Sequence, residues 1–402
     1  MVPVVGNGNE PAPPGADAVM ETVTPAGAPP TDPTAVEPVE PVGPAAPVGP
    51  ASPLLGRPGA VAAEGLDAGV AWHYGDPTRE QRGLADGTAV TDLSHRGVLR
   101  LTGPDRLSWL HSLTTQHLLA LPAGSSAETL VLSPHGHVEH ALHLVDDGAA
   151  AWITVEPGTA AALAGWLDRM RFMLRVEVAD VGADWAAVGL VAAAGQAPST
   201  SGGEAVAAAL GGPGLPPSWQ DPWPAVVPGS VSYAAVPDAE HPGTERPWRE
   251  VLVPRAELAE RLRDVPLAGS WASEALRVAA WRPRLGAETD HRTIPHEVDW
   301  LRTAVHLAKG CYRGQETVAR VHNLGKPPRR LVLLHVDGSE HLLPAPGDDV
   351  VLGERVVGRV TTAARHHELG PVALALVKRS TPVDAVLAVA GLAAAQEVVV
   401  RP

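Results

Sequence analysis

The chain has 402 residues, a formal net charge of −14 and an apolar content of 45 per cent. This length predicts two or three domains with a substantial buried core. No uninterrupted apolar run approaches the ~20 residues that span a bilayer, so no membrane partner is expected. The acidic charge argues against a general DNA-binding protein, which carries a basic surface. The single cysteine excludes an intramolecular disulfide, and the N-terminus lacks the pattern of a secretory signal, so a cytoplasmic location is expected.

Residues 1–60 differ in composition from the rest of the chain. They are rich in Pro, Ala, Gly and Val, and residues 1–56 contain six acidic side chains and no Lys or Arg. A segment without apolar periodicity cannot bury enough surface to fold. We therefore predict a disordered acidic tail, with order beginning near Val61.

Residues 61–180 are predicted to form a first α+β part. Pro104 suits the first position of a helix, and Asp146-Asp147-Gly148 is typical of a hairpin turn. The mixture of neighbouring antiparallel strands and covering helices indicates the α+β class. The predicted elements are strands at 89–94 and 97–102, a helix over 104–113, strands at 128–133, 137–145 and 151–155, a helix over 159–170 and a strand at 174–178.

Residues 181–325 are predicted to form a second α+β part, and residues 326–402 a small β-barrel. In the second part we expect a flexible Gly/Pro/Ser-rich insertion at 194–222, a strand at 250–253 and helices over 255–263 and 271–281. After Pro327-Pro328 only short strands separated by Gly and Pro follow, which is typical of a barrel. These strands are predicted at 331–336, 350–352, 355–361, 372–377 and 385–389.

The only cysteine lies in an unusual octapeptide, Lys309-Gly310-Cys311-Tyr312-Arg313-Gly314-Gln315-Glu316. Free cysteine most often behaves as a small buried apolar residue. Here, however, two cations flank the thiol, glycines permit tight or left-handed backbone, and a helix is predicted to begin at Gln315. The cations and the helix dipole would both stabilise a thiolate, so we predict a reactive Cys311.

The octapeptide, read as K-G-C-[FY]-x-G-Q-E, resembles the signature of the YgfZ family of folate-binding, iron-sulfur cluster maintenance proteins. The similarity continues at 92–97, 101–105, 276–280, 317–320 and 357–361, and so covers about residues 61–402. It implies the aminomethyltransferase-like folate-binding fold, in which two ferredoxin-like α+β parts surround a central cavity and a small C-terminal β-barrel follows.

The resemblance also implies the site residues and the ligand. Cys311 is the expected key thiol, and Arg292 and Glu297 are candidates for orienting the ligand. The ligand is expected to be tetrahydrofolate or another folate derivative, without a permanently bound metal. Cys311 would contact a cluster only transiently, because clusters typically need four protein ligands. The signature residues expected at the folate cavity are Lys309, Gly310, Tyr312, Arg313, Gly314, Gln315, Glu316 and Arg320.

A basic stretch surrounds the signature, since residues 301–332 carry seven cations and one glutamate. In an acidic protein this predicts an anionic ligand, and both the glutamate tail of a folate and a tRNA backbone qualify. A solvated arginine-rich face is the alternative. The cations are Arg302, Lys309, Arg313, Arg320, Lys326, Arg329 and Arg330.

The implied function is that of a folate-binding accessory protein in the assembly or repair of iron-sulfur clusters, [4Fe-4S] clusters in particular. Its implied partners are client apoproteins or the assembly machinery, including tRNA-modifying enzymes, and classical turnover is not expected. The alternative is a tetrahydrofolate-dependent aminomethyltransferase of the glycine cleavage type. Against it, Ala279 replaces the glutamate expected to grip the pterin, and residues 135–140 lack paired aspartates. A non-enzymatic scaffold is the third possibility.

Four histidines crowd one predicted hairpin, at His135, His137, His140 and His143. They have no recognised zinc spacing and no cysteine nearby. We therefore interpret them as exposed hairpin side chains and predict no resident metal.

Overall fold

The computed structural model describes residues 50–192 and 201–402. The predicted tail lies outside the described residues up to position 49. Its last part is described and is ordered, which corrects the predicted boundary: η1 (Pro53–Gly56) is a 3-10 helix and Leu54 is buried. The Ser52 hydroxyl also bonds to Asp92 in the interior. Burial of Leu54 anchors this Pro- and Ala-rich segment, because burial of a leucine side chain is strongly favourable.

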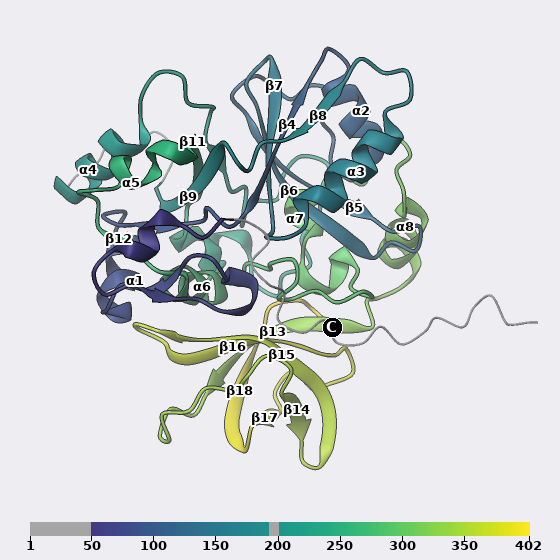
Figure 1. The fold of residues 1–402 in the computed structure, drawn as a ribbon. Helices are drawn as coiled ribbons and strands as arrows, with labels where there is room; N and C mark the ends of the chain where they lie inside the picture. Colours follow the sequence, from purple (N-terminus) through teal and green to yellow (C-terminus); the bar gives the residue numbers. More distant parts are fainter. Residues whose placement is uncertain (1–49, 193–200) are drawn as a thin grey trace, which may run out of the picture. The chain divides into compact units, whose positions relative to one another are not determined.

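The first sheet is antiparallel and is formed as predicted, with one displaced strand. Leu163 and Leu167 of the covering helix α3, one turn apart, are fully buried against it (Figure 1). The strand order is β5 (Ser126–Leu132), β6 (Val138–Asp146), β7 (Ala150–Val155), β4 (Gly97–Thr102) and β8 (Glu177–Asp180). The helices that contact this sheet are α2 (Arg106–Leu113), α3 (Ala160–Met170) and the short α7 (Leu301–Ala304).

The displaced strand is β8, which was predicted at 174–178 and begins instead at Glu177. Phe172 has a φ of +46°, a left-handed conformation that breaks the chain direction just after α3. The backbone N–H of Arg175 then donates to the Asp105 carboxylate, 2.9 Å away. Residues 172–174 therefore form a loop, although their apolar character is typical of a strand.

The second sheet combines strands from both predicted α+β parts. β3 comes from the first part and pairs with β9 and β12, so the predicted boundary near 180 does not coincide with the division between the sheets. The helices α1 (Pro77–Ala85) and α6 (Ser270–Ala279) contact each other and β12. The strand order is β10 (Trp219–Gln220), β11 (Trp248–Pro254), β9 (Trp185–Val191), β3 (Val90–Asp92) and β12 (Leu267–Ala268).

The predicted insertion at 194–222 contains regular structure in its described part. The helix α4 (Ser201–Leu210) buries Val206 and Leu210, one turn apart. The helix predicted over 255–263 is shorter than expected and begins as a 3-10 turn. The remaining elements are β1 (Val61–Ala62) paired with β2 (Ala71–His73), η2 (Gly65–Asp67), η3 (Asp238–Glu240), η4 (Pro242–Glu245), η5 (Arg255–Glu257), α5 (Leu258–Arg261), η6 (Pro295–Val298) and α8 (Gln315–Leu324).

The C-terminal region is a closed barrel, as predicted, with one strand more than the sequence indicated. The missed strand is β18, whose Leu-Ala-Ala-Ala start lacks the β-branched residues that mark strands. The barrel order is β13 (Arg329–Val336), β16 (Gly370–Lys378), β15 (Arg355–His366), β14 (Asp349–Leu352), β17 (Val386–Val389) and β18 (Leu392–Val398).

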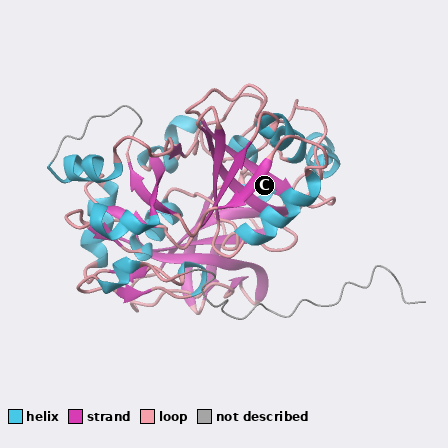
Figure 2. Cartoon of the chain, turned by 45° about the horizontal axis from the view of Figure 1, so that its top comes forward, coloured by secondary structure: helices cyan, strands magenta, loops and turns pink. Residues whose placement is uncertain are grey.

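The described part of the chain is thus α+β with a barrel, which confirms the predicted fold class. In Figure 2 the helices lie outside the strands of the two sheets. None of the helices within residues 50–192 and 201–402 has the length and apolar character needed to cross a membrane.

Candidate functional site

The signature forms a tightly packed loop ahead of α8, which begins at Gln315 as predicted. Gly314 has a φ of +82°, and a Cβ added there would lie 2.5 Å from the backbone oxygen of Ser133. A Cβ at Gly136 would lie 2.7 Å from the Thr317 side chain. The signature and the turn at 133–137 therefore approach each other at a distance that only glycine permits.

Cys311 is exposed on this loop, which contradicts the interpretation of a buried apolar cysteine. The next residue, Tyr312, points the other way: it is buried in a core cluster that includes Leu132 and Trp300. Tyr312 anchors the loop and the thiol faces solvent. Gly310, Gln315 and Glu316 complete the loop and the first turn of α8.

Lys309 has hydrogen-bond partners of its own on another element. Its buried ammonium donates to the backbone oxygens of His111 and Thr114, and to that of Gln116 at 3.3 Å. These carbonyls lie at or just after the C-terminus of α2, where a cation is favourable. Burial lowers the pKa of Lys309 to about 8. Lys309 thus fixes the loop to α2.

Arg313 also has a partner of its own. Its guanidinium donates two hydrogen bonds to the carboxylate of Glu139, at 2.9 and 3.2 Å. The same guanidinium lies 6.0 Å from the ring centre of Trp166 on α3. The pair is about one-third exposed, so it contributes little to stability and mainly positions the side chain.

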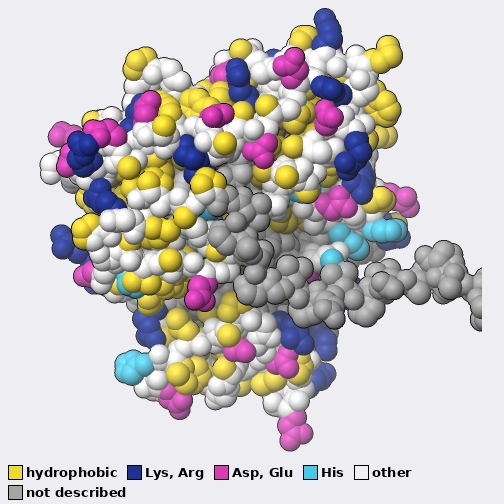
Figure 3. Space-filling model, viewed as in Figure 1, with side chains coloured by type: hydrophobic (Ala, Val, Ile, Leu, Met, Phe, Trp, Pro, Cys, Tyr) yellow, Lys and Arg dark blue, Asp and Glu magenta, His cyan; other side chains and the backbone are white. Residues whose placement is uncertain are grey.

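The basic stretch at 301–332 is less positive than its composition predicted. Arg302 is fully buried and pairs with Asp299 and Asp238. Arg329 donates to Asp290 and to Glu297. Figure 3 shows Lys and Arg side chains scattered among Asp and Glu on one face of the molecule. The partners of Arg302 and Arg329 lie outside the basic stretch, so its composition alone overstates its positive charge.

Two further arginines of the basic stretch, and the two residues expected to orient the ligand, lie in different surroundings. Arg330 is buried and donates to Thr381 and Gln396, whereas Arg320 is exposed and has no partner in the described part of the chain. Glu297 is buried and its carboxylate holds Arg329, while the exposed Arg292 contributes only its backbone N–H to Asp290.

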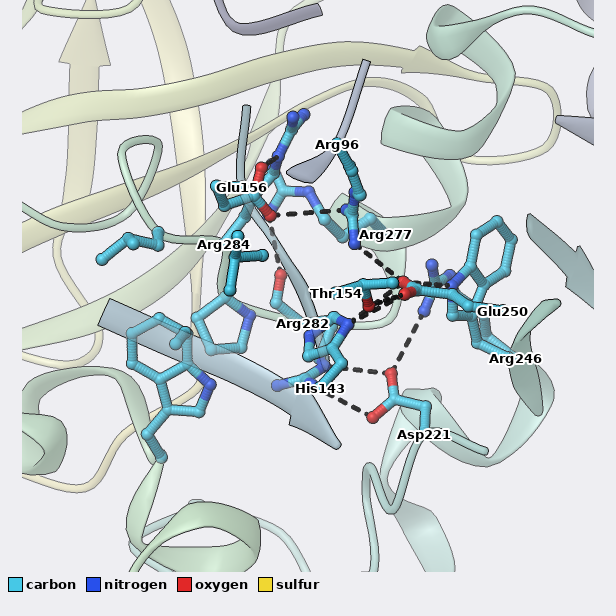
Figure 4. Close-up of a pocket in the computed structure, with 16 residues that line it drawn as sticks. Arg96, His143, Thr154, Glu156, Asp221, Arg246, Glu250, Arg277, Arg282 and Arg284 are labelled. Carbon is cyan, nitrogen blue, oxygen red and sulfur yellow. Dashed lines mark hydrogen bonds and ion pairs between the residues drawn. The ribbon is translucent and has the colours of Figure 1, made fainter. Parts of the chain in front are cut away.

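A small polar cavity lies where the two sheets meet, and Figure 4 shows the side chains that line it. They come from β6 and β7 of the first sheet, β11 of the second, α6, and the segments around Asp221 and Arg284. No residue of the octapeptide lines this cavity, nor do Arg320, Arg292 and Glu297. The signature loop and these three candidates therefore lie outside this particular cavity.

Glu250 is the central carboxylate of the cavity and is almost completely buried. It accepts hydrogen bonds from Arg96 and Thr154 at 2.7 Å, and His143 Nδ1 lies 3.1 Å from both of its oxygens. Burial raises the pKa of the Glu250 carboxyl, but His143 and Arg96 outweigh it and hold that pKa well below its usual range. The imidazole of His143 also stacks on Trp219, with ring centres 3.8 Å apart.

His143 is thus an interior residue, and its interpretation as an exposed hairpin histidine is wrong. The strand β6 turns it inward, whereas His135 and His137 stay in the turn, with ring centres 6.2 Å apart. Among residues 50–192 and 201–402, no group of three His, Cys, Asp or Glu side chains could hold a metal ion.

Three further arginines surround the cavity with buried ion pairs in two groups: Arg277 and Arg284 share Glu274, and Arg282 shares Asp221 with Arg246. Arg277 pairs with Glu274 and Glu288, and Arg282 pairs with Glu128 and Asp221. Arg284 pairs with Asp67, Glu156 and Glu274. Such a group is strongly destabilised when one member is removed, because a buried charge then loses its partner.

The cavity does not fit a pterin as its side chains stand. Its volume is about 30 Å³. That volume holds about two or three water molecules, whereas ligand pockets usually measure about 300–1,000 Å³. Both oxygens of Glu250 already accept hydrogen bonds from side chains of the chain itself. A pterin would have to displace Arg96 or His143 in order to reach this carboxylate.

Ala279 lines a different pocket of about 390 Å³, together with Trp281 and with His366 of the barrel. The small polar cavity does contain a carboxylate, that of Glu250. Sequence reasoning missed Glu250 because it lies in a strand with no local motif, and only β11 brings it opposite His143.

Comparisons with known proteins place the fold. No family model matches the chain. It is 28% identical over 280 residues to the chloroplastic protein At1g60990 of Arabidopsis thaliana, whose name assigns it provisionally to the transferases; the match covers 69% of this chain and 62% of that protein, less than two thirds of its length. It is 25% identical over 322 residues to the aminomethyltransferase of Streptomyces avermitilis, covering 76% and 82% of the two chains.

A shorter match concerns the family suggested by the octapeptide. The chain is 30% identical over 154 residues to the tRNA-modifying protein YgfZ of Pectobacterium atrosepticum, which covers 33% of this chain and 46% of that protein. Among solved structures, the glycine cleavage system aminomethyltransferase T from Bartonella henselae aligns with a TM-score of 0.66 and 19% identity, over 87% of this chain and 95% of the other. The predicted aminomethyltransferase-like fold is confirmed.

Proposed function

We propose that this chain is a folate-binding accessory protein that acts in the assembly or repair of iron-sulfur clusters in client enzymes, with Cys311 as its key thiol. The observation that carries the proposal is the placement of the only cysteine: it is exposed, on a loop that is anchored on both sides, on an aminomethyltransferase-like fold. The match to a tRNA-modifying protein supports clients that modify tRNA. The proposal includes a cytoplasmic site of action, which the absence of any cysteine pair supports.

The loop geometry defines what Cys311 can do. Lys309 and Tyr312 hold the backbone on either side of the thiol, and Gly314 holds the loop against residue 133. Because the thiol is already held in position, its contact with a cluster or a client cysteine requires little entropic cost for ordering the loop. Because one thiolate cannot hold a cluster alone, the other ligands must come from the client or the assembly machinery. Cys311 would thus be a transient ligand.

The cluster role is tested by replacing the thiol. In cells that lack the chain, wild type should restore the activity of a tRNA-modifying enzyme with a [4Fe-4S] cluster, and Cys311→Ala should not. The matched control is Val386→Ser, which changes an exposed side chain on β17 of the barrel, outside the signature. The control should restore activity fully. Restoration by Cys311→Ala equal to wild type would remove the cluster role.

The folate part of the proposal rests on the likeness to proteins of the aminomethyltransferase and YgfZ kind. It is tested by calorimetric titration with tetrahydrofolate. Wild type should bind, and Cys311→Ala is titrated beside it, since equal affinities would separate the thiol from the folate site. Absence of binding to wild type would remove the folate claim. A Glu250→Gln variant locates the ligand: altered affinity would show that the cavity opens, and unchanged affinity would place the ligand elsewhere.

The alternative function is tetrahydrofolate-dependent one-carbon transfer, as in an aminomethyltransferase. The observation that favours it is the buried carboxylate of Glu250, which the sequence had seemed to lack. The observation against it is that this carboxylate is already fully hydrogen-bonded within the chain. Tetrahydrofolate-dependent turnover by wild type that disappears in Glu250→Gln would decide for the transferase.

A further inference from the structure

An exposed apolar tip follows helix α3. Phe172, Met173 and Leu174 have exposed fractions of 83%, 97% and 43%. Phe172 is the only phenylalanine of the chain, and such residues are mostly buried in soluble proteins. Neighbouring exposed apolar side chains of this size indicate an interaction surface.

The tip is held in place by its flanks. On one side, Trp109 Nε1 donates to the backbone oxygen of Met170, 3.2 Å away, and fixes the end of α3 to α2. On the other side, the backbone and guanidinium of Arg175 donate three hydrogen bonds to Asp105, at 2.9 to 3.2 Å. Between them, the N–H of Leu174 donates to the oxygen of Arg171. The apolar side chains are therefore presented by an ordered turn, at low entropic cost for binding.

The helix that precedes the tip also lies beside the signature loop. Trp166 of α3 lies six residues before Phe172, and its ring centre is 6.0 Å from the guanidinium of Arg313, two residues after Cys311. We call this surface the thiol face, and define it by Trp166, Arg169, Phe172, Met173, Leu174, Cys311 and Arg313.

The charge of the thiol face differs from that of the whole chain. Arg169 has no partner in the described part of the chain, whereas Arg171 pairs with the exposed Asp168 and also donates to the backbone oxygen of Val176. The unpaired Arg169 favours an acidic group on the partner surface. An anionic membrane is less suitable, since the net charge of the chain repels it and Asp168 lies beside the apolar residues.

We propose that the thiol face is the docking surface for the client protein. Phe172 and Met173 enter an apolar recess of the client, Arg169 faces an acidic rim beside that recess, and the docked client has its cluster-binding loop close to Cys311. The identity of the partner rests on the proposed function, whereas the existence of the surface does not. The proposed step is non-covalent docking only.

The test uses the full chain and a purified apo form of a [4Fe-4S] tRNA-modifying enzyme as the probe. The variant is Phe172→Ser/Met173→Ser, and the matched control is Val386→Ser, which changes an apolar residue that is 69% exposed on β17 of the barrel. In interferometry the control should bind the apoenzyme like wild type. The double variant should bind about tenfold more weakly or worse, as expected for the loss of a central apolar anchor.

The outcomes separate this inference from the proposed function. Phe172→Ser/Met173→Ser should lose docking and client activity together, whereas Cys311→Ala should fail to restore client activity. If it restores activity, the role of the thiol falls while the docking surface stands. Equal binding by the double variant, or no binding by wild type, overturns the docking surface. Two other results would also overturn it. One is binding of wild type to phosphatidylserine vesicles that the double variant abolishes; the other is concentration-dependent dimerisation of wild type in sedimentation that the double variant abolishes.

Discussion

The signature loop and the central cavity both contain charged residues, but they use them differently. In the loop, Lys309 and Arg313 are close in sequence to the thiol, and each is held by a partner on another element. In the cavity, carboxylates and arginines that are far apart in sequence meet and neutralise one another. Proximity along the chain is therefore a poor guide to which charges act together. The loop presents a thiol, whereas the hydrogen bonds and ion pairs around the cavity join the two sheets.

The largest expected effect is in the cavity. Arg282→Ala removes the shared partner of Glu128 and Asp221 and leaves two buried carboxylates without it. The free energy of unfolding, measured with urea, should fall by about 3–5 kcal/mol. Arg359→Ala on the barrel is the control, because its pair with Asp349 is exposed and should contribute at most about 1 kcal/mol. A loss below that control would contradict the view that the ion pairs around the cavity stabilise the fold.

The second effect concerns a histidine beneath α8. Burial, followed by the nearby His322, lowers the pKa of His296 to about 4, although a backbone hydrogen bond with Val318 acts in the opposite direction. Because the unfolded chain binds this proton near pH 6.5, stability is retained above that pH and lost as the pH falls toward 4. Between pH 7.5 and 5 the loss from His296 should be about 2 kcal/mol.

The measurement compares urea unfolding of wild type and His296→Gln at both pH values. The variant should lose less stability on acidification than wild type. If both proteins show the same dependence on pH, His296 is not buried in its neutral form.

The third effect concerns the loop backbone. Gly314→Ala places a Cβ at a φ of +82° and 2.5 Å from the Ser133 oxygen, which should cost about 1–3 kcal/mol of stability. The thiol of Cys311 should also react faster with a disulfide reagent, because the loop loses its contact with the turn. Gly310→Ala should leave both the melting temperature and the reaction rate unchanged. An unchanged rate in Gly314→Ala would show that the loop does not position the thiol.

The smallest effect is expected for Arg313→Ala. Its pair with Glu139 is about one-third exposed, so the free energy of unfolding should change by less than about 1 kcal/mol. Thermal unfolding with added salt checks this expectation, since screening should weaken the wild-type pair and reduce the difference. A larger loss would mean that the loop depends on its charges as the cavity does.

Much of the fold followed from local patterns. The barrel after Pro327-Pro328, the helix α8 at Gln315 and the hairpin at 146–148 depend on residues that are neighbours in sequence. Errors arose where a local pattern competed with a distant contact: β8 begins late because Asp105 holds Arg175, and residues 50–60 are ordered because Leu54 finds a core.

The sequence by itself determined the fold class, the closed barrel and the presence of one thiol in a glycine-bounded loop, since these depend on periodicity and turn residues. Only the tertiary structure decided which charges are free. Arg282 meets Glu128 across 154 positions, and Arg284 meets Glu156 across 128. Ion pairs have no period along the chain, so the basic stretch, the cavity carboxylate and the surroundings of Cys311 could be assigned only once the sheets had brought their partners together.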